Sequence, residues 1–192
     1  MTLCSSLVRA AVLAGAAGLA SVPALAADWA VDAGASKLGF SGTQNGEAFS
    51  GKFARFTGTI TFDPAKPQAG RADITIDMAS ASTGDTQRDE ALPQPEWFDA
   101  KKFPQAHFVS SGFKAKGGGA YEADGQLSIR DVALPVTLPF TLTITGDTAH
   151  AKGRAELVRT KFGVGQGPWS SGQWVALEVG VDVDLVAKKA GG

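Results

Sequence analysis

The sequence predicts an all-β protein, an antiparallel β-barrel of about eight strands with a short helical insertion near residues 85–100. Apolar residues alternate with polar or small ones in many segments, which is typical of strands with one buried face. Glycine-containing turns separate these segments, and the 192 residues suit one domain. Closure into a barrel removes exposed strand edges. An open sandwich is the alternative architecture.

The first 26 residues have the pattern of a secretory signal peptide. Arg9 ends a short polar start, residues 10–22 are uncharged and mainly apolar, and residues 24–26 (Ala-Leu-Ala) form a small-x-small cleavage site. The apolar run is shorter than the ~20 residues that span a bilayer, so a membrane anchor is the weaker alternative. We expect cleavage after Ala26, export to the periplasm and a mature domain of residues 27–192.

The next segments show where strands and the insertion should lie. Phe49 and Phe53 share one parity, whereas Phe56 and Phe62 share the other, which predicts a β-bulge near residues 54–55. Strict alternation follows in residues 72–78. The stretch after it differs, because Asp85 is suited to capping a short helix that ends before Pro93. We expect this helical insertion to cover one end of the barrel.

The C-terminal half continues the period-two pattern. Threonines alternate with the apolar residues around residue 140, which is typical of the outer face of an antiparallel sheet. The alternating segments are residues 121–129, 132–144, 149–159 and 175–185.

The composition excludes several classes of function. The formal net charge is −1, with 18 Lys and Arg against 19 Asp and Glu, so the chain lacks the basic surface that nucleic acids require. Its single cysteine, Cys4, lies in the expected signal peptide, which excludes a disulfide framework and a cysteine-based metal site in the mature chain. We expect no metal, no cofactor and no nucleic-acid partner.

Catalytic patterns are weak. Neither His107 nor His150 has a second histidine or cysteine at metal-ligand spacing, and there is no Gly-x-Ser-x-Gly motif. The glycine-rich residues 163–167 are followed by Pro168 where a phosphate-binding loop needs lysine. We therefore predict no catalytic residue.

Aromatic residues are numerous for a chain of this size. The 11 Phe and 4 Trp either fill a solid core or line a deep apolar pocket, and a barrel of about eight strands permits both. Parity gives the residues expected to line the interior: Phe40, Phe53, Ile60, Ile76, Leu127, Phe140 and Leu177.

A series of short motifs extends from Trp29 to about Ala187. The motifs are Trp29-x-Val31-Asp32, Phe49-x-Gly51-x-Phe53, Ser82-Thr83-Gly84 with Arg88-Asp89, Trp97-Phe98-Asp99, Gly125-x-Leu127-x-Ile129-Arg130 and Arg159-x-Lys161-Phe162-Gly163. In this order they resemble the YceI-like, polyisoprenoid-binding protein family. Residues 165–169 resemble a subgroup that is sometimes fused to cytochrome b561-type membrane domains. Two positions depart from the family pattern: Lys161, where many relatives have an acidic residue, and Asp131, where glycine is common.

The resemblance implies a lipocalin-like barrel in the periplasm that holds a long isoprenoid, or a similar amphiphilic lipid or quinone, for carriage, storage or sequestration. Two alternatives stay open: an enzyme that acts on a small apolar lipid or quinone, and a partner module for a membrane cytochrome b561-type redox protein. Transient contact with a membrane or membrane protein, and a homodimer, also stay open.

A bound amphiphile must keep its polar end near solvent or near a donor, because burying it unpaired costs several kcal/mol. We expect residues 88–103 and 163–172 to form the entrance. The residues expected there are Arg88 or Arg159 on the headgroup, and Trp97, Phe98 and Trp169 over the first carbons of the tail. Alternatively, Arg88 is structural and pairs with Asp85 or Asp89.

Overall fold

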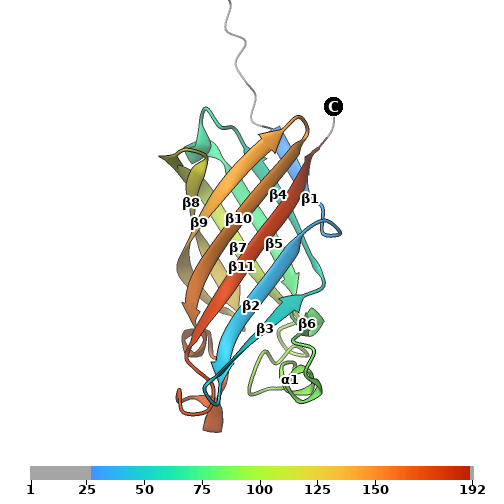
Figure 1. The fold of residues 1–192 in the computed structure, drawn as a ribbon, viewed down its shortest axis with the longest axis vertical. Helices are drawn as coiled ribbons and strands as arrows, with labels where there is room; N and C mark the ends of the chain where they lie inside the picture. Colours follow the sequence, from blue (N-terminus) through green and yellow to red (C-terminus); the bar gives the residue numbers. More distant parts are fainter. Residues whose placement is uncertain (1–26, 191–192) are drawn as a thin grey trace, which may run out of the picture.

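The computed structural model describes residues 27–190, and the predicted signal peptide of residues 1–26 lies outside this range. The described chain forms an antiparallel sheet that closes on itself (Figure 1). No helix within residues 27–190 is long and apolar enough to cross a membrane. The strands are β1 (Ala27–Val31), β2 (Lys37–Gln44), β3 (Glu47–Phe53), β4 (Phe56–Phe62), β5 (Arg71–Asp77), β6 (Ala81–Ser82), β7 (Gln105–Gly117), β8 (Ala120–Ile129), β9 (Val132–Thr145), β10 (Thr148–Val158) and β11 (Glu178–Lys189).

The labelled strands occupy eight positions around the barrel, because three of these positions are each made of two shorter strands. We call each position a stave. β1 and β2 both pair with β11, at different levels, and act as one stave. β3 and β4 form the second stave, and β5 and β6 form the third. Each stave is antiparallel to its neighbours in the sequence, and the pairing of β1 with β11 closes the barrel. The predicted all-β barrel with a short helical insertion is confirmed.

The break between β3 and β4 lies at residues 54–55, where the change of parity predicts it. The break is larger than a single-residue bulge because it involves two staves. The third stave is interrupted at the same level, between β5 and β6, by the 3-10 turn η2 (Met78–Ser80). Ser80 joins the two breaks: its carbonyl accepts from the Ala54 N–H at 3.1 Å and its hydroxyl accepts from the Arg55 N–H at 3.0 Å. The break allows both Phe53 and Phe56 to face the interior.

Alternation in β9 separates the interior from the outer face. Apolar residues from Val132 to Leu142 are partly buried, and every residue between them is exposed. Pro135 and Pro139 lie in the half of β9 that pairs with β8, whereas the ladder to β10 covers Phe140 to Thr145. Proline donates no hydrogen bond, so it is tolerated where a strand has a partner on one side.

Two segments cover the same end of the barrel, which we call the mouth. The insertion segment (residues 83–104) contains α1 (Thr86–Ala91), and the β10–β11 loop (residues 159–177) contains the 3-10 turns η3 (Arg159–Phe162) and η4 (Gly167–Trp169). Both lie at the lower end of the barrel in Figure 1. The Asp85 side chain caps α1 by accepting from the Arg88 N–H at 3.0 Å, and the helix ends before Pro93, as predicted.

The turn between β8 and β9 places two non-glycine residues at positive φ, Arg130 at 51° and Asp131 at 61°. A two-residue hairpin of this kind favours glycine, because side chains are strained in the left-handed region. Asp131→Gly should therefore raise the free energy of unfolding by about 0.5–1 kcal/mol, measured by urea unfolding. The matched control is Asp147→Gly in the next hairpin turn, where φ is negative, and this variant should gain no stability. Equal gains in both variants would contradict the explanation.

Candidate ligand-binding cavity

A cavity of about 390 Å³ lies at the mouth of the barrel. Its walls come from the barrel strands, the insertion segment and the β10–β11 loop. Sites for small molecules have volumes of roughly 300–1,000 Å³ and are mostly apolar, so the size and lining suit an apolar ligand. The aromatic lining residues are Phe40, Phe49, Phe53, Trp97, Phe98, Phe162 and Trp169.

A second cavity, of about 150 Å³, lies deeper in the barrel, and we call it the inner cavity. All its lining side chains within residues 27–190 are apolar or aromatic, from Trp29 to Ala187. The two cavities share five lining residues: Leu38, Ile76, Leu127, Leu157 and Val181. The two cavities therefore lie next to each other inside the barrel.

Eleven of the twelve residues expected to bind a ligand line these cavities. Those at the mouth cavity are Phe40, Phe53, Arg88, Trp97, Phe98, Arg159 and Trp169; those at the inner cavity are Ile60 and Phe140; and Ile76 and Leu127 line both. Leu177 lines neither cavity, so its predicted placement is wrong. It precedes β11 and belongs to the β10–β11 loop, where strand parity does not apply.

Aromatic contacts connect the barrel wall to the covering segments. Phe53 lies between Phe40 and Phe98, with ring centroids 5.2 Å and 6.0 Å away, and Phe98 belongs to the insertion segment. Trp97 of the insertion segment and Trp169 of the β10–β11 loop lie 5.7 Å apart. Such pairs contribute about 0.5–1.5 kcal/mol beyond their buried area. The mouth is thus partly covered by rings from three different parts of the sequence.

Arg159 organises the β10–β11 loop from within. Its side chain is buried, with 5% of the residue exposed. The guanidinium donates to six backbone carbonyls, those of Val164, Gly165, Trp169, Ser171, Val175 and Ala176, at 2.6–3.4 Å. Because arginine has five N–H donors, these contacts use all of them. The geometry therefore gives Arg159 a structural role rather than the alternative role on a headgroup.

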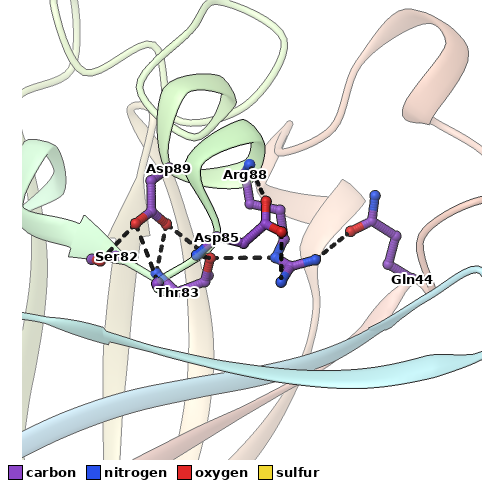
Figure 2. Close-up of polar contacts among 7 residues, drawn as sticks. Gln44, Ser82, Thr83, Asp85, Arg88 and Asp89 are labelled. Atoms are coloured by element: carbon purple, nitrogen blue, oxygen red, sulfur yellow. Dashed lines mark hydrogen bonds and ion pairs between the residues drawn. The ribbon is translucent and has the colours of Figure 1, made fainter.

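Arg88 lies nearer to the opening. Its Nε donates to the Thr83 hydroxyl at 3.3 Å, one terminal nitrogen donates to Gln44 Oε1 at 3.0 Å, and the other lies 3.6 Å from an Asp85 oxygen (Figure 2). The guanidinium also lies over the Phe49 ring, 5.0 Å from its centroid. The predicted pairing with Asp85 is therefore present. Of its five N–H donors, two make these hydrogen bonds and a third faces Asp85, and the residue lines the mouth cavity.

Asp89 fixes the loop that leads into α1. Its carboxylate accepts from the Thr83 N–H at 2.6 Å, the Thr83 hydroxyl at 2.8 Å, the Ser82 hydroxyl at 2.7 Å and the Gly84 N–H at 3.2 Å (Figure 2). These donors, the Thr83 N–H foremost, lower the pKa of Asp89 from its ordinary 3.8 to about 2. Asp89 thereby holds the segment that carries Arg88 beside the cavity.

Comparison with known proteins places the chain in a family. The YceI-like domain family matches residues 29–187, nearly all of the described chain. The chain belongs to the YceI-like family. A UPF0312 protein from Pseudomonas savastanoi pv. phaseolicola is 30% identical over 190 residues, which span 94% of this chain and 97% of that relative.

Solved structures of other proteins share this barrel fold. BcnA from Burkholderia cenocepacia is 39% identical, with a TM-score of 0.79, and the match covers 82% of this chain and 99% of BcnA. A polyisoprenoid-binding domain from Saccharophagus degradans is 16% identical, with a TM-score of 0.67, over 84% of this chain and 98% of that domain. The likeness to the Saccharophagus degradans domain shows a shared fold.

The two departures from the YceI-like pattern have different structural settings. Lys161 is exposed, and Arg159, two residues earlier, takes carbonyl oxygens as acceptors, so it needs no acidic partner at position 161. Asp131 occupies the positive-φ turn position described above, where glycine is less strained.

Two connections at the mouth are not predicted by the sequence. Arg130, at the β8–β9 turn, donates to the Pro95 carbonyl at 2.5 Å and also to the Trp97 carbonyl. The Glu96 carbonyl accepts from the N–H groups of Gly165 and Gln166 at 2.8 and 2.7 Å. The insertion segment is thus joined to the barrel and to the β10–β11 loop. Backbone carbonyls are the acceptors in both cases, and the sequence pattern gives no signal for them.

Both histidines lie on the outer face of the YceI-like barrel. Their neighbours Ala106, Phe108, Ala149 and Ala151 line the cavities, and alternation points His107 and His150 the other way. His107 Nδ1 lies 3.2 Å from the Thr75 hydroxyl, and His150 Nε2 lies 2.5 Å from an Asp184 oxygen. The His150 contact lowers the pKa of Asp184. Neither histidine lines the cavity.

Asp89→Asn should lower the free energy of unfolding at pH 7 by about 1–2 kcal/mol, because an amide keeps one acceptor oxygen where the carboxylate has two. The pKa of Asp89 is about 2 in the folded protein against an ordinary 3.8. Its ionised form therefore favours the folded state above pH 4, and this contribution is lost as the pH falls toward 2. The free energies of unfolding of the wild type and of Asp89→Asn, measured in urea, should therefore converge as the pH falls toward 2.

The control for this experiment is Glu90→Gln, at the exposed next position in α1. This variant removes a carboxylate from the same helix and should follow the wild type from pH 7 to pH 2. A difference between Asp89→Asn and wild type that is as large at pH 2 as at pH 7 would show that ionisation of Asp89 is not the cause.

Proposed function

We propose that this YceI-like protein binds a long-chain isoprenoid, or a similar amphiphilic lipid or quinone, inside the barrel. The hydrocarbon chain lies in the two cavities and the headgroup lies at the mouth. We further propose that the protein works in the periplasm, after removal of residues 1–26, in carriage, storage or sequestration of this lipid. The likeness in fold to the polyisoprenoid-binding domain of Saccharophagus degradans supports this class of ligand.

The observation that carries the proposal is the gradient of polarity along the cavities. The polar side chains of the mouth cavity include Gln44, Asp85, Gln87 and Arg88, whereas the inner cavity is lined by apolar and aromatic side chains. An amphiphile likewise has a polar headgroup at one end and an apolar chain at the other. Each buried CH₂ is worth roughly 0.8 kcal/mol, so a chain of about ten methylenes gains on the order of 8 kcal/mol before the costs of ordering it.

The headgroup subsite is centred on Arg88. A guanidinium at the wall of the mouth cavity suits an oxygen acceptor such as a carbonyl or hydroxyl group. The Asp85 carboxylate 3.6 Å away balances the arginine charge. The subsite is therefore polar with little net charge, and it provides hydrogen bonds at the point where a lipid leaves the apolar cavity.

The decisive experiment is solvent extraction of the protein purified from the periplasm of its host, followed by mass spectrometry. A stoichiometric long-chain lipid supports the proposal. A protein that carries no lipid and takes up none when incubated with isoprenoid alcohols or quinones overturns it. Chemical conversion of the added lipid would instead support the alternative of an enzyme. The intact mass of the same sample tests whether the chain begins at Ala27.

Arg88→Met should weaken binding of geranylgeraniol about tenfold, because a hydrogen bond from a charged donor to the hydroxyl is lost. Affinity for the hydrocarbon of the same chain without the hydroxyl should stay unchanged. The control is Arg55→Met, since Arg55 is exposed and pairs with Asp77 at 2.8 Å outside both cavities. Equal losses for both ligands, or no loss for either, would show that Arg88 is structural.

A further inference from the structure

The ladder between β9 and β10 stops partway along the barrel. Its last pair is Gly153 with Phe140. Within residues 27–190, the rest of β10, residues 154–158, pairs with β11 alone, and residues 132–139 of β9 pair with β8 alone. We call these two unpaired stretches the seam. The seam lies in the half of the barrel nearer to the mouth, because β10 leads from it into the β10–β11 loop.

Two prolines keep the β9 side of the seam unpaired. The Leu142 N–H donates to the Gly119 carbonyl, on the β8 side of β9. Successive residues of a strand direct their N–H groups to alternate sides, so the odd-numbered positions of β9 face β10. Pro135 and Pro139 occupy two of these positions, and proline has no N–H. The sequence therefore removes donors at the boundary where the ladder stops.

The β10 side of the seam is unpaired as well. The Arg159 N–H donates to the Leu177 carbonyl on the β11 side, so by the same alternation Glu156 and Val158 direct their N–H groups toward β9. Neither residue has a pairing partner in β9. The strands can therefore move apart at these positions without breaking a ladder hydrogen bond.

The inward side chains of the seam line the proposed ligand site. Val136, Leu138 and Ala155 line the inner cavity, and Leu157 lines both cavities. A gap between β9 and β10 would thus lead from the outside of the barrel directly to the space proposed for the hydrocarbon chain.

The segments that cover the mouth are held more firmly. The Glu96 carbonyl accepts from two N–H groups of the β10–β11 loop, and Arg130 donates to two carbonyls of the insertion segment. Lifting the insertion segment away would break these hydrogen bonds, each of which stabilises the covered arrangement. A chain therefore meets more resistance beneath this cover than at the seam.

We propose that the lipid enters and leaves the barrel sideways, through the seam between β9 and β10. The proposal rests on the function proposed above and adds the route of its ligand. The two strands move apart to admit the hydrocarbon chain and close behind it. The headgroup follows into the mouth cavity, which Leu157 of the seam also lines.

The test bridges the seam covalently. Counting on from the pair Gly153 and Phe140, Thr137 lies opposite Glu156, and both side chains are exposed. In a Cys4→Ser background, Thr137→Cys and Glu156→Cys supply the two cysteines that a short bismaleimide joins, and mass spectrometry verifies the bridge. Uptake of decylubiquinone is followed by rapid mixing, through its quenching of tryptophan fluorescence. The bridge should slow uptake at least about tenfold and leave the amount bound at equilibrium unchanged.

Two further bridges, made with the same reagent, are the controls. Thr137→Cys with Asp124→Cys joins residues that already pair across the β8–β9 ladder, so uptake should keep the rate of the unbridged protein. Glu96→Cys with Gln166→Cys joins the insertion segment to the β10–β11 loop at two exposed positions and should also leave the rate unchanged. Slower uptake with this bridge, but not with the seam bridge, would overturn the proposed route. Failure of the wild type to bind decylubiquinone would instead count against the proposed function.

Hydrogen exchange of the wild type keeps the proposal testable if the seam bridge does not form. The N–H groups of Glu156 and Val158 face the seam and should exchange quickly. Those of Ala155 and Leu157 face β11, with which both residues pair, and should exchange slowly. Equal protection at all four positions would contradict the seam.

The double variant Pro135→Thr with Pro139→Thr restores both missing donors on β9. The ladder to β10 should then extend, so exchange at Glu156 and Val158 should slow and uptake of decylubiquinone should slow in parallel. Slower exchange with an unchanged rate of uptake would show that the lipid does not use the seam.

Discussion

Arg159→Lys should lower the free energy of unfolding by about 3–4 kcal/mol. The guanidinium reaches six backbone carbonyls of the β10–β11 loop at once. A lysine ammonium has three donors at a single point. Several buried carbonyls would lose their partner, and each such group costs about 1–3 kcal/mol.

Urea unfolding measures the stability loss, and hydrogen exchange locates it. Exchange in Arg159→Lys should rise first in the β10–β11 loop, before the barrel strands. Arg154→Lys is the control, because Arg154 is exposed on the outer face, where it pairs with Asp182 at 2.8 Å. Its unfolding midpoint should stay close to that of the wild type. Matching midpoints for both lysine variants would contradict the structural role of Arg159.

The loop depends on glycine as well as on arginine. Gly165 has a φ of +81°, and a Cβ there would lie 1.8 Å from a terminal nitrogen of Arg159. The backbone therefore passes so close to the guanidinium that no side chain fits between them. Arg159 and Gly165 are six residues apart, and their relation follows from the path of the loop rather than from any periodic pattern.

Most of the barrel could be predicted because a strand with one buried face has a period of two residues. The pattern placed β5, β8, β9 and β10 to within a few residues, and the parity change at residues 54–55 located a break in the second stave. The pattern failed at residues 175–177. Their apolar alternation continues that of β11, yet these residues belong to the loop that Arg159 organises.

The polar contacts at the mouth were less predictable. A pairing of Arg88 with Asp85 follows from their spacing of three residues at the start of a helix. In contrast, Arg130 and Arg159 take backbone carbonyls as acceptors, and every residue type has a carbonyl. Sequence reasoning could place an arginine at the mouth but could not decide whether its donors were free for a ligand.

Phe53→Glu should abolish lipid binding while the barrel stays folded. Phe53 is partly buried and lines the mouth cavity, with the rings of Phe40 and Phe98 at 5.2 Å and 6.0 Å. A carboxylate at this position would place a charge beside the path of the hydrocarbon chain, and burying a charge in apolar surroundings is strongly unfavourable. We expect at least about a tenfold fall in the lipid recovered per mole of protein.

The control is Val109→Glu on the outer face of β7, where the residue is 48% exposed. It adds the same charge without reaching either cavity, so its lipid content should match the wild type. Circular dichroism and urea unfolding must be measured on both variants. In the lipid-free Phe53→Glu protein the carboxylate can turn toward the solvent at the mouth, so the charge need not be buried. The barrel of this variant should therefore remain folded and unfold cooperatively in urea. Global unfolding of Phe53→Glu would show instead that the aromatic residues form a solid core, in which a lipid has no place.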